Sequence, residues 1–348
     1  MSQHDADVSD RAGKQTQQRK AEHLRLAAAD RMQTHERYFD HYALPHRALP
    51  DVDFDAIDTG VTFLGKELQA PLLISCMTGG TDQARSVNRV LARAAEDTGI
   101  AVGVGSQRAA LEQKEQTATF QIRDDAPTVP LLGNLGAVQL NEGYGLAECQ
   151  AAVRMIDADA LTFHLNPLQE AIQPEGDRNF AGLLPKMGAV AEQLDVPVIA
   201  KEIGCGLSGA TAEQLVHHGI TIIDVAGQGG TSWARIEAER ADDLSLGDLF
   251  GNWGLPTPTA IREVRQVEGA TVIGSGGLRS GLDIAKALAL GAELAGMASP
   301  FLKAAMESEQ AVRAKIEQTI RELKIAMFCA GARTIDELRQ LPVTKRPQ

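Results

Sequence analysis

The chain has 348 residues, of which 44% are hydrophobic and 23% are charged, enough for one large domain or two ordinary ones. The 34 lysines and arginines against 46 aspartates and glutamates give a formal net charge of −12, which disfavours nucleic acid and anionic membranes as partners. The four scattered cysteines form no CxxC pair, which argues against a zinc site and a disulfide framework. No apolar run approaches the roughly 20 residues of a membrane span, and the N-terminus lacks an apolar signal core. We therefore expect a soluble cytoplasmic protein.

The N-terminal segment differs in composition from the rest of the chain. Residues 1–18 are polar and contain almost no large apolar side chains, so we expect them to be disordered. From Arg19 to about Asp40 the pattern becomes charged and helical or irregular. This stretch is interpreted as an arm that leads into the domain.

From residue 70 onward, short apolar runs alternate with segments of helical periodicity. Continuous apolar strands separated by helices are typical of a parallel sheet covered by helices, and eight such units in about 250 residues favour a closed barrel. We therefore predict an α/β fold, a (β/α)8 TIM barrel with an N-terminal arm, in which residues 19–348 form a single domain. The eight predicted strands are Leu72–Ser75, Ala101–Val104, Val129–Leu132, Ala160–His164, Pro197–Lys201, Thr221–Val225, Thr271–Gly274 and Leu294–Met297.

Helical periodicity is clearest at Val87–Asp97, Ala147–Ile156 and Ile284–Leu290. The segment Gly229–Pro258 is longer than an ordinary βα loop, so we expect a functional insertion there.

Polar residues and glycines gather where the predicted strands end, which is where barrels of this kind place their active sites. After the last two strands, Gly276-Gly277 and Ala298-Ser299 lie where such barrels usually bind a phosphate. We expect Gly276-Gly277 to open the helix after the seventh strand; the alternative is a pair of tight turns.

Lys201 ends the fifth apolar strand and is expected to point into the barrel mouth. There it would place a positive charge beside a cofactor such as a flavin. The alternative is a lysine that extends to solvent.

The segment from His164 to Glu170 is the most informative for the substrate. His164 is the histidine that a predicted strand places at its end, although a buried structural histidine is the alternative. Glu170 is suited to Mg²⁺, which prefers one or two carboxylates together with substrate phosphates. A solvated glutamate in the first turn of a helix remains open.

The cations Arg19 and Lys20, with His23, lie at helical spacing in the arm. Such a cluster is often a solvated face, yet an acidic protein with an anionic ligand needs local cations.

Taken in order, these motifs resemble those of the type 2 isopentenyl diphosphate isomerases, and the resemblance runs from Arg19 to about Ala330. It is carried by the following stretches: Arg19-Lys20-x-x-His23, Met77-Thr78-Gly79-Gly80, Gly105-Ser106-Gln107-Arg108, Asn134-Leu135-Gly136-Ala137, His164-Leu165-Asn166-x-x-Gln169-Glu170, Lys201-Glu202-x-Gly204-x-Gly206, Gly229-Gly230-Thr231-Ser232 and Gly276-Gly277.

The resemblance implies a site with FMN, Mg²⁺ and isopentenyl diphosphate, and NAD(P)H as the reductant of FMN. The implied FMN-binding residues are Met77, Thr78, Gly79, Ser106, Asn134, Lys201, Thr231, Gly276, Gly277, Ala298 and Ser299. The implied substrate-binding residues are Arg19, Lys20, Ser106, Gln107, Arg108, His164, Asn166 and Gln169. Glu170 would hold Mg²⁺, and Gln169 is the candidate catalytic side chain, although an amide is a weak acid and base.

The implied reaction moves a double bond, converting isopentenyl diphosphate to dimethylallyl diphosphate without net redox change. Reduced FMN would then transfer the proton. The resemblance also implies a homotetramer or homo-octamer.

Two other functions remain open. An FMN-dependent 2-hydroxy acid oxidase would carry His-Gly-Gly-Arg after the sixth strand, where this chain has Gln228-Gly229-Gly230-Thr231. A non-catalytic flavin or phosphate sensor would need the glycines but neither Glu170 nor the cationic arm.

Overall fold

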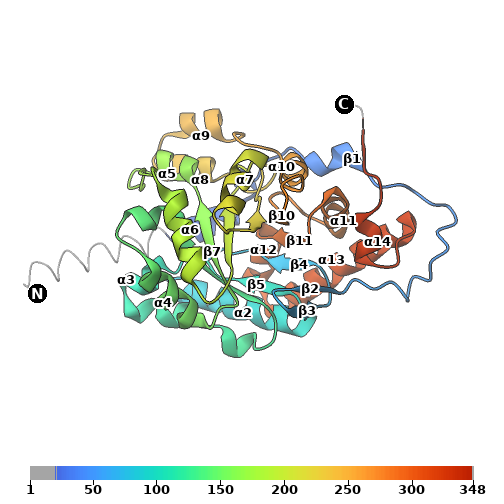
Figure 1. Cartoon of the computed structure of the whole chain (residues 1–348), viewed down its shortest axis with the longest axis horizontal. Coiled ribbons are helices and arrows are strands. Elements are labelled where there is room, and N and C mark those ends of the chain that lie inside the picture. The colour runs from blue at the N-terminus through green and yellow to red at the C-terminus, as the bar shows by residue number, and fades with distance from the viewer. Residues whose placement is uncertain (1–19, 21, 347–348) are drawn as a thin grey trace, which may run out of the picture.

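The computed structural model describes residue 20 and residues 22–346 of the chain. Arg19 and the predicted disordered segment 1–18 lie outside the described residues. Eight parallel strands close into a barrel in the order β10-β11-β4-β5-β6-β7-β8-β9, which confirms the predicted fold (Figure 1). The strands are β4 (Leu72–Ile74), β5 (Ala101–Gly103), β6 (Leu131–Gly136), β7 (Ala160–Leu165), β8 (Val198–Glu202), β9 (Ile222–Asp224), β10 (Thr271–Ser275) and β11 (Leu294–Met297).

All eight predicted strands are present, and the third differs most in its limits. β6 begins at Leu131 and continues through Gly136, because its backbone pairs with β7 from Leu132↔Ala160 to Gly136↔His164. The four residues from Gly133 to Gly136, which follow the predicted strand, therefore belong to the strand itself.

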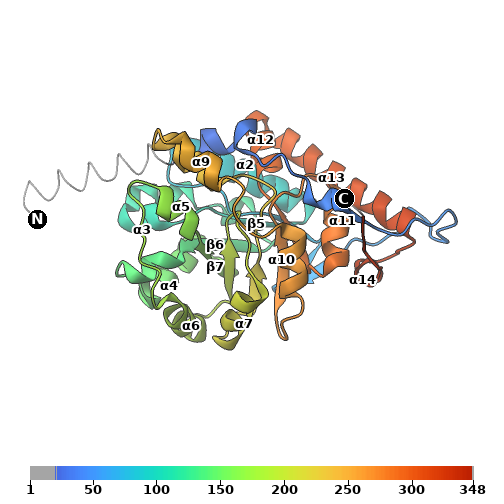
Figure 2. The same ribbon diagram turned by 90° about the horizontal axis from the view of Figure 1, so that it is seen from above.

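Helices surround the barrel and bury one face against it (Figures 1 and 2). In α2 (Asp82–Thr98), the buried residues Ala84, Val87, Leu91 and Ala95 recur at helical spacing. The Thr81 side chain caps the first turn of α2, and Gly99 ends the helix in the left-handed conformation. The other long helices are α4 (Leu146–Ile156), α6 (Leu183–Gln193), α7 (Gly209–His217), α10 (Thr257–Val264), α11 (Gly281–Leu290), α12 (Ser299–Glu307) and α13 (Glu309–Ala330). Among the described residues, no helix is long and apolar enough to cross a membrane.

The interior of the barrel changes from apolar to polar along the strands. One layer of side chains is entirely apolar and packs on Phe63 and Leu68 of the hairpin β2 (Val61–Phe63) and β3 (Lys66–Leu68). This layer consists of Leu73, Ala101, Leu132, Ala160, Ile199, Ile222, Ile273 and Leu294. Two residues further along each strand, on the same face, every position is polar or glycine. These positions are Ser75, Gly103, Asn134, Thr162, Lys201, Asp224, Ser275 and Gly296.

The segment between β9 and β10 contains α8 (Trp233–Arg240) and α9 (Leu244–Phe250) ahead of α10. An insertion in this segment was predicted from its length. It lies at the same end of the barrel as the polar layer, because it follows the carboxyl end of β9.

The N-terminal arm crosses this end of the barrel (Figure 2). After helical residues 22–27, the chain passes through η1 (Asp30–Met32) and η2 (Tyr38–His41), and β1 (Tyr42–Ala43) pairs with β12 (Thr344–Lys345) near the C-terminus. The backbone N–H of Thr34 donates to the Gly230 carbonyl at 2.7 Å, and Arg279 donates to the Thr34 carbonyl at 2.7 Å. The arm is therefore bonded directly to the loops that follow β9 and β10.

Candidate functional site

A cavity of about 770 Å³ opens at the carboxyl ends of the strands, between the barrel and the arm. Its volume lies within the range of small-molecule and cofactor sites. The ends of all eight strands contribute residues to its wall, and the arm adds Lys20, His23 and Leu24 among others. The cavity therefore lies where the site was predicted.

Almost all residues proposed for the site from the sequence meet at this cavity. The proposed residues that line it are Lys20, Met77, Thr78, Gly79, Ser106, Arg108, Asn134, His164, Asn166, Gln169, Glu170, Lys201, Thr231, Gly276, Gly277, Ala298 and Ser299. Arg19 lies outside the described residues.

Gln107 does not line the cavity, in contrast to the predicted substrate contact. Its side chain is fully buried; Nε2 donates to the Ala152 carbonyl at 2.8 Å, and Oε1 accepts from the Asn134 backbone N–H at 2.9 Å. Gln107 therefore connects β6 to α4 and holds Asn134 in place.

The glycines after β10 form a close backbone contact with the loop after β9. Gly276 has φ +98° and Gly277 has φ +77°, in the left-handed region where an L side chain is strained. A Cβ atom on Gly276 would lie 2.1 Å from the Gly227 carbonyl oxygen, and one on Gly277 would lie 2.5 Å from the Gly229 carbonyl carbon. Only glycine fits at either position, so backbone amides are bare of side chains at this wall of the cavity.

The expectation that Gly276-Gly277 opens a helix is wrong. The Ser280 side chain caps the next helix, so α11 begins only at Gly281. The helix that starts at the cavity is α12, whose N-cap is Ala298 and whose first residue is Ser299. No side chain caps α12, so the positive end of its dipole meets the cavity beside the glycines and favours an anion there.

Lys201 is 7% exposed and does not extend to solvent. Its Nζ donates to the Glu202 carbonyl at 2.6 Å and lies 3.8 Å from Oδ2 of Asp224. The expected cation in the barrel mouth is therefore present, with a buried carboxylate next to it that the sequence did not single out.

His164 faces the cavity from the end of β7, and its Nδ1 lies 2.8 Å from Oδ1 of Asn134. Because the amide oxygen can only accept, the proton of this hydrogen bond belongs to Nδ1. Burial, and secondarily the charge of Lys201, lower the pKa of His164 to about 4. His164 is therefore neutral near pH 7 in the ligand-free protein.

Glu170 is buried on α5 (Pro167–Ile172), so the alternative of a solvated first-turn glutamate is wrong. Its Oε1 accepts from the Asn166 amide at 2.7 Å, and its Oε2 accepts from the Asp177 backbone N–H at 2.8 Å. The described residues contain no group of three or more His, Cys, Asp or Glu side chains arranged to hold a metal. A metal at Glu170 would take its remaining ligands from water and substrate.

Glu237 is a buried residue of the site that sequence reasoning missed. It is fully buried on α8, where its Oε1 lies 2.8 Å from His23 Nε2 and accepts from Gln169 Nε2 at 2.7 Å. Arg240 donates to its Oε2 at 2.6 Å. Although burial favours the neutral acid, the hydrogen bond with His23 leads the effects that keep the pKa of Glu237 below its usual value. The only signal in the sequence was its place in the long insertion.

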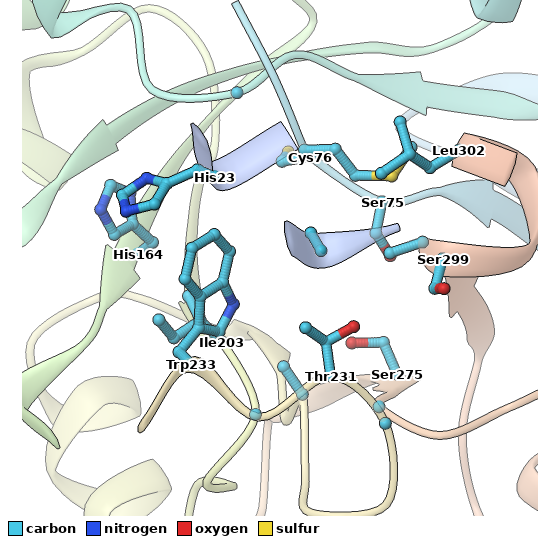
Figure 3. A pocket seen from close by; sticks show the side chains of 18 of the residues that line it. His23, Ser75, Cys76, His164, Ile203, Thr231, Trp233, Ser275, Ser299 and Leu302 are labelled. Atoms are coloured by element: carbon cyan, nitrogen blue, oxygen red, sulfur yellow. The ribbon is translucent and has the colours of Figure 1, made fainter. Parts of the chain in front are cut away.

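The cavity has two polar ends separated by an apolar part (Figure 3). Figure 3 shows His23 and His164 on one side, and Thr231, Ser275 and Ser299 on the other. Trp233 and Ile203 lie between them on one wall, and the rings of Trp233 and His23 meet edge to face with centroids 5.2 Å apart. Trp233 was also missed, because an isolated tryptophan carries no spacing signal.

Cations gather at the His164 end. Lys20 Nζ donates to the Ser106 carbonyl at 3.1 Å and lies 5.1 Å from the centroid of the Phe120 ring. Arg108 is held by Asp177 at 2.6 Å and by Glu112 at 2.7 Å. The arm therefore contributes a cation to the cavity, and the alternative of a wholly solvated arm is wrong.

Comparison with known proteins assigns the chain to a family. The model of the FMN-dependent dehydrogenase family matches residues 12–127 and 173–345. An isopentenyl-diphosphate delta-isomerase of Nostoc sp. is 49% identical over 340 residues, which are 96% of this chain and 97% of that protein. The enzyme of the same name from Paracoccus zeaxanthinifaciens is 51% identical over 331 residues, 92% and 95% of the two chains. The chain belongs to the FMN-dependent dehydrogenase family and, within it, to the isopentenyl-diphosphate delta-isomerases.

Solved structures share the fold at low identity. A mandelate oxidase bound to (S)-2-phenylpropionate superposes with a TM-score of 0.62 at 19% identity, over 94% of this chain and 91% of the oxidase. A lactate oxidase of Pediococcus acidilactici gives 0.65 at 17% identity, over 89% and 85%. These oxidases and this chain share the architecture of the fold. After the sixth barrel strand, however, this chain has Gln228 and Thr231 where the oxidase alternative requires histidine and arginine. Family membership thus favours the isomerase over both alternatives.

Proposed function

We propose that the chain isomerises isopentenyl diphosphate to dimethylallyl diphosphate in this cavity, with reduced FMN and Mg²⁺. The observation that carries the proposal is the division of the cavity into two polar ends with an apolar wall between them: backbone amides and the N-terminus of α12 line one end, and cations line the other. One end suits the phosphate of a flavin nucleotide, and the other suits a diphosphate. The near 50% identity to isomerases over almost the whole chain supports the same substrate.

The residues around the glycine end fit FMN. Gly276 and Gly277 line the cavity without side chains, and together with the N-terminus of α12 they offer backbone amides to an anion there. The Oγ atoms of Ser75 and Thr162 are buried without a hydrogen-bond partner in the polar layer of the barrel. When bound in its reduced form, FMN supplies the acid–base chemistry for adding and removing the proton. Met77, Thr78, Asn134 and Lys201 would hold the ring and ribityl chain.

The opposite end would bind the diphosphate. Lys20 and Arg108 offer cations, and Asp177 now holds the guanidinium of Arg108 as an anionic group from the ligand would. Ser106, His164 and Asn166 line the same end. An incoming dianion stabilises the imidazolium, so we expect the pKa of His164 to rise when the diphosphate binds.

The surroundings of Glu170 fit a hydrated Mg²⁺, which Glu170 would hold next to the diphosphate. Mg²⁺ usually keeps several waters and takes only one or two protein carboxylates. Two amide oxygens, Oδ1 of Asn166 and Oε1 of Gln139, are buried in the cavity wall without a hydrogen-bond partner. Both amides donate their NH₂ groups to carboxylates, to Glu170 and Asp177, which fixes their oxygens as free acceptors for water.

Gln169 would position the substrate. Its Nε2 donates to the Glu237 carboxylate and its Oε1 accepts from the Asn166 amide, so the orientation of the Gln169 amide is fixed. An amide is a weak acid and base, and the fixed orientation suits a positioning role more than proton transfer.

The apolar wall would surround the carbon skeleton. Trp233, Ile203 and Leu24 exclude water from this part of the cavity. Positive charge that develops on the skeleton would meet the face of an aromatic ring, which stabilises cations. The NAD(P)H reductant, the homo-oligomeric state and the cytoplasmic location inferred from the sequence stay predictions.

The test is a visible spectrum of the purified protein followed by an anaerobic assay with isopentenyl diphosphate, Mg²⁺ and photoreduced FMN, without nicotinamide. We expect dimethylallyl diphosphate to form over many turnovers while the flavin stays reduced. Loss of turnover without nicotinamide would contradict the non-redox role of the flavin. Flavin reduction by lactate or glycolate, with no isomerisation, would instead support the oxidase alternative.

A further inference from the structure

Three polar residues on successive strands form a buried group beneath the cavity. Lys201 of β8 and Asp224 of β9 are paired in the strand register. Asp224 is paired in turn with Ile273 of β10, and Ser275 lies two residues further along that strand. All three side chains point to the barrel interior, because apolar residues of the inner layer precede each of them by two positions. Lys201 and Ser275 line the cavity, whereas Asp224 lies behind them.

Asp224 is held in one orientation. It is 1% exposed, and its Oδ1 accepts from the Ser275 hydroxyl at 2.5 Å and from the Ala226 backbone N–H at 3.3 Å. These two bonds leave Oδ2 directed at the Lys201 ammonium, 3.8 Å away. The ammonium is fixed from its other side by the Glu202 carbonyl at 2.6 Å.

Packing alone does not account for this carboxylate. A buried ion pair costs desolvation of both charges, and apolar residues of similar size usually replace one without loss of stability. The six other positions of the polar layer carry uncharged residues, so closure of the barrel does not require ionised groups at this level. The pair therefore has a role toward whatever occupies the cavity above it.

We propose that Asp224 is a positioning residue that orients Lys201 and offsets its charge, and thereby sets how strongly the site prefers reduced over oxidised FMN. The inference rests on the proposed function, because it requires FMN in the cavity. A bare lysine in a buried site would strongly stabilise the anionic reduced ring. With Asp224 beside it, the pair is neutral overall and presents an N–H donor with a weaker positive field. This weaker positive field is suited to a flavin that exchanges a proton, and not electrons, with the substrate.

The perturbations are Asp224→Asn, Lys201→Met and the double variant, all as holoenzymes. Loss of the Asp224 charge leaves Lys201 uncompensated, so the ratio of reduced to oxidised FMN affinity should rise about tenfold, which for a two-electron couple is about 30 mV in midpoint potential. Lys201→Met should lower that ratio. The double variant should recover most of this loss, since both charges are then gone.

The midpoint potential is measured by equilibration with reference dyes, and sulfite affinity of the oxidised flavin gives a second measure that rises with positive charge near the ring. Asp157→Asn is the matched control: it removes one carboxylate at the opposite end of the barrel, where the side chain is 90% exposed. It should change neither quantity.

Two results would overturn the inference. One is an Asp224→Asn potential equal to that of the wild type while Lys201→Met shifts it; the other is a double variant with the same potential as Lys201→Met. The second comparison still applies if Asp224→Asn alone fails to fold, because the double variant buries no unpaired charge. If the wild-type protein binds no FMN, the proposed function itself fails, and the two failures are distinguished by the visible spectrum.

Discussion

Substitution of Gly277 by alanine tests the phosphate cradle most directly. A left-handed conformation costs an L residue about 1–2 kcal/mol, and Gly277 has φ +77°. In addition, the new Cβ would lie 2.5–2.9 Å from the carbonyl carbon, oxygen and Cα of Gly229. These are backbone atoms and cannot rotate away, so the loops after β9 and β10 must separate.

Gly219→Ala provides the matched control. Gly219 has φ +81°, and a Cβ there would meet nothing within 4 Å. Both variants should therefore lose about 1–2 kcal/mol of unfolding free energy from the backbone alone, reduced somewhat by the lower entropy of the unfolded chain. Only Gly277→Ala should lose more.

The consequence for FMN follows from the same geometry. If these amides bind the FMN phosphate as proposed, their displacement would remove at least one hydrogen bond to a charged group, and such bonds contribute about 1.5–3 kcal/mol each. We expect the Kd for FMN to rise about 10- to 100-fold in Gly277→Ala and to stay unchanged in Gly219→Ala. Urea unfolding of the apoproteins and titration by flavin fluorescence measure the two effects separately. A Gly277→Ala protein that binds FMN as tightly as Gly219→Ala would refute the assignment of the cradle.

Three further predictions concern the opposite end of the cavity. Glu170→Gln should raise the Mg²⁺ concentration needed for half-maximal activity at least tenfold and leave the flavin spectrum unchanged. The control Glu192→Gln, which changes an exposed residue on α6, should have no effect. Loss of FMN from Glu170→Gln would contradict the metal assignment. Lys20→Met should raise KM for the diphosphate about tenfold relative to Lys114→Met, and an unchanged KM would show that Lys20 does not bind the diphosphate. Because burial above all lowers the pKa of His164 from 6.5 to about 4, unfolding free energy should rise with pH between these values by at most about 3 kcal/mol. His164→Gln should flatten that rise in urea unfolding measured from pH 4 to 7, and an unaltered slope would show that His164 titrates normally.

Local patterning was sufficient to predict the barrel. Each strand is a short apolar run with glycine or a polar residue within it or directly after it, and both features are present in consecutive residues. The limits of β6 were less predictable, because Gly133 and Asn134 look like a loop and are kept in the strand by pairing with β7. Pairing with a neighbouring strand is a long-range property that a local pattern does not contain.

The residues of the candidate site likewise fall into those that local sequence predicts and those that depend on packing. Residues that reach the cavity directly from a strand end, such as Lys201 and His164, were identified from position alone. Gln107 was misassigned because it stands in the same loop as Ser106, yet its side chain turns inward to Ala152. Glu237 was missed because it reaches the site through the packing of α8 on α5 and on the arm, which no spacing in the sequence records.

The polar layer of the barrel shows that the sequence contains information about the site beyond its short motifs. In every strand an apolar inward residue is followed two positions later by a polar residue or glycine, as in Ile199 and Lys201 or Leu132 and Asn134. A barrel that served only as a scaffold would repeat apolar residues at both positions, because a buried polar group costs free energy unless it is bonded. A change from apolar residues to polar residues or glycine at the same level in all eight strands therefore marks the floor of the cavity. There Lys201, Asp224 and Ser275 bond to one another, and Ser75 and Thr162 keep buried hydroxyls without a hydrogen-bond partner. Asp224 belongs to this polar layer but to no recognised motif. Its buried charge beneath the proposed flavin site could therefore be identified only once the register of the strands was known.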